Sequence, residues 1–326
     1  MKPVRALFDA VHIPTGTPPY ATAHVKLYYP AAPQNTETEK RTGIIPAEKE
    51  ASPMPVVVFC GGINVGMGGY HWLAVQLAAV GIVTVLYSYV AHTLPNVVGL
   101  TPGIDLDKVT PDTYGRGPTS PVLAPILKLL ERLNTEPTSP VHNSLALSKI
   151  VLGGHSAGGT VALQNAQYFE QIVGSFAYAG HTMASTMLGF APKTILPIGE
   201  KPVLLMYGDQ DGVIHASSQR YGVSEHGTNP VQLTLKKGYT GRPEKGHAVC
   251  VKGANHFSIV HPQDHTTGRA FLDQPDLHPE QTRTHLFSLV CAFIQQITNS
   301  DLASRQKFAD AVPAVTCLSG DLLDFA

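Results

Sequence analysis

The chain has 326 residues, of which 43% are hydrophobic and 14% are charged. Because soluble domains usually carry about 25% charged residues and disordered chains are poor in apolar ones, this composition predicts a folded protein with a weakly charged surface. The 23 basic and 24 acidic residues leave a formal net charge of −1, which excludes the basic footprint of a nucleic-acid-binding protein. Length alone favours about two domains.

The first two segments with strand character, residues 4–13 and 23–29, alternate polar and apolar residues. This pattern predicts an antiparallel pair at a sheet edge. Arg5 and Asp9 interrupt the apolar residues of the first segment before a secretory signal core can form. Later apolar stretches, at 55–60 and 81–89, are far shorter than the roughly 18 residues of a membrane span, so we expect a cytoplasmic protein without one.

Residues 34–52 are polar and predict a solvated loop. Downstream, short apolar runs without polar alternation predict strands buried on both faces, as in a parallel sheet. These runs are 56–60, 82–87, 149–152, 172–178, 203–207 and 248–251. Apolar residues at helical spacing predict crossover helices at 70–80, 121–133, 157–169 and 281–297. The order indicates an α/β fold.

Two segments that follow predicted strands contain no regular pattern, 89–120 with several prolines and 181–202 with Met183, Met187 and Phe190. Loops of this length within a compact domain are usually functional or disordered. Both follow carboxyl ends of strands, where parallel sheets bind ligands. We therefore interpret them as insertions that form a cap over a site.

The four cysteines, Cys60, Cys250, Cys291 and Cys317, include no C-x-x-C pair. This spacing argues against a zinc site or a redox dithiol. Buried free thiols are the simplest interpretation, and a Cys291–Cys317 disulfide around the C-terminal helix is the alternative.

The strongest motif lies directly after the strand that ends at Leu152. Residues 154–158 read Gly-His-Ser-Ala-Gly, a G-x-S-x-G sequence between a predicted strand and a predicted helix. At such a turn the serine is held in a strained conformation that exposes its hydroxyl, and the flanking glycines avoid collisions. The turn also points the first helical amides at the attacked group, so Ser156 is a candidate nucleophile and Ala157 a candidate oxyanion donor.

A serine nucleophile needs a base, and the base needs an acid to fix its tautomer. Asp209 and Asp211 follow the predicted strand 203–207, and we favour Asp211 because Asp209 comes at the turn itself. His256 follows the predicted strand 248–251 and is the candidate base. The chain order is therefore nucleophile, acid, base, which is the order that α/β-hydrolases use.

These residues resemble the α/β-hydrolase superfamily, and within it the dienelactone-hydrolase-like, cutinase-like and chlorophyllase-like esterases. The match runs from the strand at Val56 to the helix ending near Ile297. The resemblance implies a second oxyanion amide in the loop after residues 56–60, at Ile63, with Gly62 or Asn64 as alternatives because Cys60-Gly61-Gly62 replaces the usual His-Gly spelling. Dienelactone hydrolases use a cysteine nucleophile and chlorophyllases usually carry arginine after the serine, so neither substrate assignment transfers.

The predicted function is a serine carboxylic-ester hydrolase with one domain spanning residues 1–326, because triad residues on one sheet leave no room for a boundary. The open alternatives are an amidase, formamidase or thioesterase with the same triad, and a catalytically silent binding protein. Low charge favours a small-molecule ester with an apolar part. Residues that could line its pocket, or simply be core, are Asn64, Met67, Tyr70, Tyr89, Met183 and Met187.

No metal or other cofactor is expected. His261 and His265 flank Pro262, which opposes helical presentation of the two imidazoles, and no metalloprotease motif is present. His155 is interpreted as a packed side chain of the turn, since neighbouring residues on a tight turn point apart. The sequence carries no signal for an oligomeric state.

Overall fold

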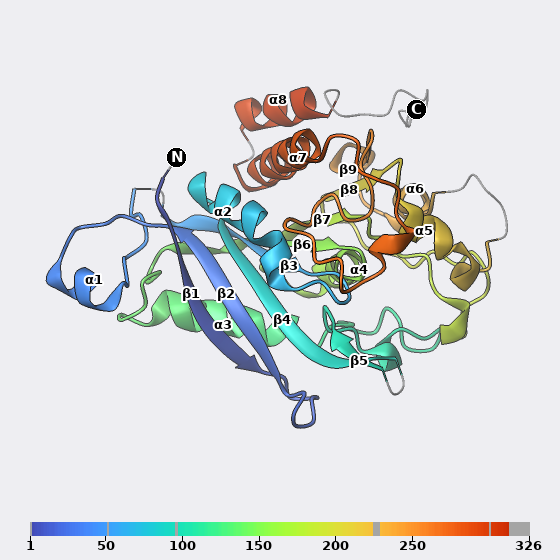
Figure 1. The fold of residues 1–326 in the computed structure, drawn as a ribbon, viewed down its shortest axis with the longest axis horizontal. Helices are drawn as coiled ribbons and strands as arrows, with labels where there is room; N and C mark the ends of the chain where they lie inside the picture. The colour runs from blue at the N-terminus through green and yellow to red at the C-terminus, as the bar shows by residue number, and fades with distance from the viewer. Residues whose placement is uncertain (1, 51, 95–96, 224–228, 300, 313–326) are drawn as a thin grey trace.

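The computed structural model describes residues 2–50, 52–94, 97–223, 229–299 and 301–312. These residues form a nine-stranded sheet in the order β1-β2-β4-β3-β6-β7-β8-β9, with β5 paired to β4 (Figure 1). The strands are β1 Val4–His12, β2 Thr22–Pro30, β3 Met54–Cys60, β4 Val83–Leu94, β5 Val97–Leu100, β6 Leu145–His155, β7 Ile172–Tyr178, β8 Val203–Gly208 and β9 Gly246–Val251.

The predicted split between an antiparallel edge and a parallel centre is confirmed. Strands β1 and β2 pair antiparallel, as do β2 and β4, whereas β4, β3, β6, β7, β8 and β9 run parallel. The non-alternating apolar runs follow from this arrangement, because both faces of the central strands are covered. In β3, Val56 and Val58 pack into one core layer and Val57 into the other, and all three are fully buried. Each such side chain contributes about 2 kcal/mol of hydrophobic stabilisation.

Helices cover both faces of the sheet (Figure 1). Helices α2 His71–Ala79 and α7 Pro279–Asn299 share one core layer, and α8 Leu302–Ala311 packs against α7. Helices α3 Leu123–Thr135 and α4 Ala157–Asn165 share the other layer. The four helices predicted from apolar spacing therefore all form. Shorter helices are α1 Glu37–Thr42, α5 Gly212–Ala216 and α6 Pro230–Leu233.

Single turns of 3-10 helix lie among these elements, and one π-helical turn follows α6. The 3-10 turns are η1 Met67–Tyr70, η2 Leu106–Lys108, η3 Ala166–Tyr168, η4 Thr186–Leu188, η5 Ser218–Tyr221, η7 Pro243–Lys245 and η8 Ala270–Leu272, and the π turn is η6 Thr234–Gly238.

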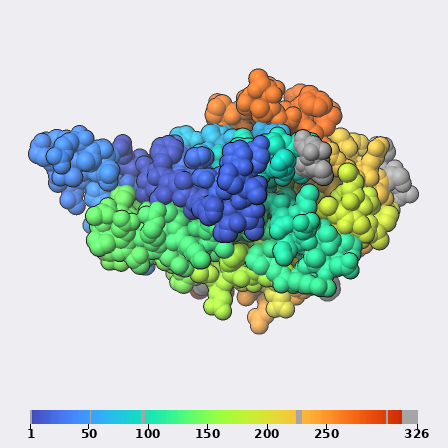
Figure 2. Space-filling view, turned by 90° about the horizontal axis from the view of Figure 1, so that it is seen from below, coloured from blue at the N-terminus to red at the C-terminus, as the bar shows by residue number. Residues whose placement is uncertain are grey.

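The prediction of a loop at residues 34–52 is wrong for α1. Its N-terminus is a capping box, in which the Glu39 amide donates to Thr36 Oγ1 and the Thr36 amide donates to the Glu39 carboxylate. No residue of α1 is buried, and Figure 2 shows this part of the chain projecting from one end of the molecule. Reciprocal caps stabilise a helix without apolar contacts, which explains why the hydrophobic pattern missed it.

The insertion at 89–120 contains more regular structure than expected. Strand β4 continues to Leu94 and pairs antiparallel with β5, so the insertion begins as a hairpin extending beyond the sheet. The insertion at 181–202 contains an isolated bridge between Met183 and Ile195. None of the helices within the described ranges is long and apolar enough to cross a membrane.

The cysteine prediction needs correction. Cys60 and Cys291 are free thiols, and Cys60 is buried. The alternative prediction of a Cys291–Cys317 disulfide is therefore wrong. Cys250 is disulfide-bonded rather than free, and residue 317 lies outside the described residues.

Candidate active site

Ser156 lies between the end of β6 and the start of α4, with backbone angles φ 55° and ψ −125°. The two flanking glycines of the motif are required by close backbone approach. A Cβ on Gly154 would collide with the backbone of Gly158, and a Cβ on Gly158 would collide with the carbonyl oxygen of Cys60 in β3. The G-x-S-x-G pattern therefore permits a turn tight enough to hold Ser156 above the sheet.

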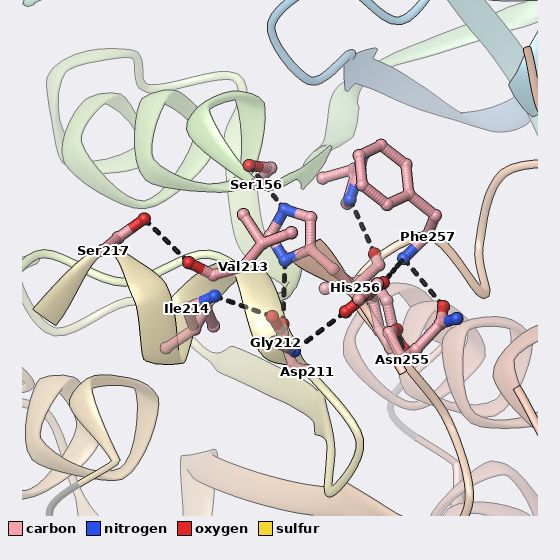
Figure 3. Close-up of polar contacts among 12 residues, drawn as sticks. Ser156, Asp211, Gly212, Val213, Ile214, Ser217, Asn255, His256 and Phe257 are labelled. Carbon is pink, nitrogen blue, oxygen red and sulfur yellow. Dashed lines mark hydrogen bonds and ion pairs between the residues drawn. The ribbon is translucent and has the colours of Figure 1, made fainter. Parts of the chain in front are cut away.

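His256 and Asp211 complete a hydrogen-bonded chain with Ser156 (Figure 3). His256 Nε2 lies 2.9 Å from Ser156 Oγ, and His256 Nδ1 lies 2.8 Å from Asp211 Oδ2. The carboxylate accepts from Nδ1–H, so Nε2 presents its lone pair to the serine hydroxyl, which donates to it. The side chains of His256 and Asp211 are each only 4% exposed.

Asp211 is fixed by its position as the N-cap of α5. Its Oδ1 accepts a hydrogen bond from the Ile214 amide at 2.8 Å, which leaves Oδ2 for the imidazole. Asp209, the alternative acid, instead accepts a 2.6 Å hydrogen bond from the Gly253 amide. Asp209 therefore joins the loops after β8 and β9 and does not contact His256.

A further carboxylate, Asp273, ties the same two loops together. Its Oδ1 accepts from the Gly212 amide at 2.8 Å and its Oδ2 from the Phe257 amide at 3.2 Å. Burial, reinforced by the nearby Asp211 charge, raises the pKa of Asp273 to about 6. Asp273 could not be predicted from the sequence, because it follows no predicted strand and lies in no motif.

His155, within the nucleophile motif, is fully buried behind the site. Its Nε2–H donates to the His256 carbonyl oxygen at 2.9 Å, so its Nδ1 accepts from the Tyr70 hydroxyl at 2.8 Å. The Tyr70 oxygen in turn accepts from the Gly62 amide at 2.8 Å. Burial, and to a lesser extent His256, lowers the pKa of His155 well below its usual range, which keeps the ring neutral. This chain joins the loop after β3 to the backbone of His256.

Hydrogen bonding distinguishes the three candidate amides in the loop after β3. The Gly62 amide donates to Tyr70 and the Asn64 amide donates to the Leu100 carbonyl at 2.9 Å. Within the described part of the chain, the amides of Ile63 and Ala157 donate no hydrogen bond, and both residues line the cavity that contains Ser156. Of the three alternatives in this loop, Ile63 alone keeps a free amide.

The cavity above Ser156 has a volume of about 450 Å³, within the range of small-molecule sites. Both insertions contribute to its wall, the first through Val97 and Ile104 and the second through Met183 and Leu188. Of the six residues proposed from the sequence to line a pocket, Asn64 and Met183 lie in this cavity wall.

The other four residues expected to line the pocket lie elsewhere. Tyr70 and Tyr89 are buried. The Tyr70 hydroxyl donates to His155, and the Tyr89 hydroxyl donates to the Tyr20 carbonyl. Met67 packs against the core layer of α2, and Met187 is 76% exposed. An apolar residue after a strand can turn to the core or to solvent as readily as to a pocket, so position alone could not place these four.

Three cavity residues with basic side chains were missed, namely His181, Arg220 and Arg269. His181 Nδ1 accepts from the Met183 amide at 3.2 Å, and burial lowers its pKa to about 4. Its ring is therefore neutral at pH 7 and carries its proton on Nε2. Among the described residues, no group of three or more His, Cys, Asp or Glu side chains is placed to hold a metal ion.

Comparison with solved structures supports the overall fold just described. A ferulic acid esterase from Streptomyces cinnamoneus is similar over 92% of this chain and 91% of its own, with a TM-score of 0.55 and 15% sequence identity. The chain has an α/β-hydrolase fold. No protein-family model matches the sequence, and no curated protein does. At this identity the likeness concerns the fold.

Proposed function

We propose that the protein is a serine hydrolase that cleaves carboxylic esters through an acyl-enzyme. The observation that carries this proposal is the Ser156–His256–Asp211 chain, with distances of 2.9 and 2.8 Å, opening onto a 450 Å³ cavity. The esterase activity named for the structural neighbour also supports an ester substrate. In this proposal one domain carries the site, with residues 89–120 and 181–202 as insertions over it.

In the first half-reaction, Ser156 Oγ attacks the ester carbonyl carbon while its proton passes to His256 Nε2. Asp211 holds the imidazole in the required tautomer and stabilises the imidazolium. The amides of Ile63 and Ala157 donate to the oxyanion, a contribution usually worth about 10²–10³-fold in rate per donor. The imidazolium then gives its proton to the departing alcohol, and the acyl group remains on Ser156.

In the second half-reaction, water attacks the acyl carbon and transfers its proton to His256 Nε2. The same two amides hold the second oxyanion. When the tetrahedral intermediate collapses, Ser156 takes the proton back from His256 and the carboxylic acid leaves. These steps require no cofactor.

The decisive experiment is Ser156→Ala, assayed with p-nitrophenyl acyl esters. We expect kcat to fall about 10⁴-fold or more in a protein with an unchanged unfolding transition. The matched control is Ser148→Ala, which removes an exposed hydroxyl from the same strand, β6, and keeps full activity. Turnover by Ser156→Ala near the wild-type rate would contradict the proposal.

Two further measurements separate the ester hydrolase from its alternatives. A panel of matched ester, thioester, anilide and formyl-amide substrates ranks the scissile bonds, and the largest kcat/KM for the ester is expected. A fluorophosphonate probe should form an adduct on Ser156, whereas a silent binding protein would show none.

A further inference from the structure

Among the described residues that line the cavity, the only Asp, Glu, Lys or Arg side chains are two arginines. Arg220 belongs to η5, directly after α5, and Arg269 precedes η8. No Asp or Glu lines the same cavity within the described ranges. A substrate entering this cavity therefore meets two cationic side chains near the triad, whose own carboxylate, Asp211, is hydrogen-bonded to His256 and to the Ile214 amide.

Within the described ranges, neither arginine forms an ion pair with a carboxylate. Among the described residues, no Asp or Glu oxygen lies within 4.0 Å of the Arg220 or Arg269 guanidinium. Arg269 is held instead by a neutral partner, since its Nη2–H donates to Ser217 Oγ at 3.1 Å, and that hydroxyl donates to the Val213 carbonyl at 2.7 Å. A guanidinium has five N–H donors, so most of those on Arg269 remain available.

The arrangement has an electrostatic cost in the free protein. Partial burial and the neighbouring Arg220 charge both lower the pKa of Arg269, while Tyr221 and Asp211 oppose them only in part. Arg220 is exposed and Arg269 is half-buried. Two like charges near each other repel, and an anion bound between them would relieve that repulsion. Arginine suits this role because its planar fork matches both oxygens of a carboxylate.

Another part of the cavity wall is apolar, formed by Ile104, Leu106, Val109, Leu188 and Leu196. The cavity therefore combines an apolar surface for a hydrocarbon segment with a cationic surface. A purely hydrocarbon ester would use the first and leave the second unpaired.

We propose that Arg220 and Arg269 form an anion subsite that selects esters carrying a free carboxylate in addition to the scissile ester. The proposal rests on the esterase function above and names its substrate class, the half-esters of dicarboxylic acids and related carboxylate-bearing esters. The carboxylate lies against the two guanidinium groups while Ser156 attacks the ester carbonyl.

The test compares two p-nitrophenyl esters of equal acyl length, the glutarate half-ester and the valerate. In low salt, wild-type kcat/KM is expected to favour the glutarate half-ester at least tenfold, the factor that a charge-assisted hydrogen bond supplies. This ratio should fall about tenfold in Arg220→Gln and in Arg269→Gln, and fall less in Arg269→Lys, which keeps the charge. The control Arg305→Gln, on exposed α8, leaves the ratio unchanged.

Two measurements on the wild type keep the proposal testable if the variants fail to fold. Raising NaCl to 0.5 M should erode the preference, because salt screens the charge pair. Free glutarate should inhibit valerate hydrolysis competitively, and neutral glutaramide should not. Hydrolysis of both esters at equal kcat/KM would overturn the anion subsite while leaving the esterase intact. Hydrolysis of neither would overturn the esterase function itself.

Discussion

Tyr70→Phe is the most informative single change outside the triad, because it deletes one oxygen that serves two elements of the site. The Tyr70 hydroxyl accepts a hydrogen bond from the Gly62 amide and donates one to His155 Nδ1, both at 2.8 Å. The ring itself is buried against Phe59 at a centroid distance of 4.8 Å. Phenylalanine retains that packing, so the variant isolates the hydroxyl.

The loss of the hydroxyl leaves the Gly62 amide and His155 Nδ1 buried without partners. Each orphaned group costs about 1–3 kcal/mol, so we expect the free energy of unfolding to fall by about 2–4 kcal/mol after partial relaxation. The loop after β3 stays in place through the Asn64 amide, which donates to Leu100. The Ile63 amide is therefore displaced rather than removed, and we expect kcat to fall about tenfold, less than for a deleted oxyanion donor.

The assays are urea unfolding and steady-state hydrolysis of p-nitrophenyl butyrate. Tyr28→Phe is the matched control, since the Tyr28 hydroxyl also hydrogen-bonds a histidine, His71 at 3.0 Å, but away from the cavity. That variant should lose about 1 kcal/mol at most and keep its kcat. If Tyr70→Phe matched Tyr28→Phe in both assays, the coupling between the loop and the site would be refuted.

Three other changes test the surrounding geometry. Asp211→Asn should lower kcat about 10³–10⁴-fold by reversing the imidazole tautomer, whereas Asp209→Asn, whose amide oxygen still accepts from Gly253, should lower it less than about threefold in the same assay. Folded Asp273, with its pKa of about 6 against an ordinary 3.8, holds a proton that the unfolded chain releases. The stability that this proton contributes is fully present below about pH 4 and is lost as the pH rises through about 6. Asp273→Asn cannot titrate, so its free energy of unfolding in urea should not show this decline with pH. Gly158→Ala should cost at least about 3 kcal/mol or prevent folding, because its Cβ meets the Cys60 carbonyl, while Gly68→Ala, with open space around it, should unfold like wild type.

The parts of the site that follow strands were accessible from the sequence. A parallel sheet places the carboxyl ends of its strands at one edge, so Ser156 after β6, Asp211 after β8 and His256 after β9 could be expected to meet. The structure brings these three side chains together. The choice of Asp211 over Asp209 also rested on local geometry, since the earlier residue lies at the turn and bonds to backbone.

The supporting residues could not be found in this way. Asp273 and Arg269 lie in a loop and beside a helical turn that no periodicity predicts. Tyr70 begins the predicted helix 70–80 and was expected to line the pocket, but its hydroxyl instead joins the Gly62 amide to His155. Their positions depend on where distant segments pack. The hydrophobic pattern reports which face of an element is buried, and it does not report which buried side chain faces a cavity.

The net charge of −1 is likewise a property of the whole chain that does not describe the cavity. A near-neutral chain favoured an apolar ester, because net charge averages over the whole surface. A substrate experiences only the groups within about one Debye length, roughly 8 Å at physiological salt. Within the described cavity wall those groups include Arg220 and Arg269 and no lining carboxylate. The cavity wall therefore presents two cationic side chains even though the chain as a whole is near neutral. If substrate preference follows the cavity, adding a carboxylate to the acyl chain should improve kcat/KM, whereas removing the charge of Arg305 on α8 should change nothing.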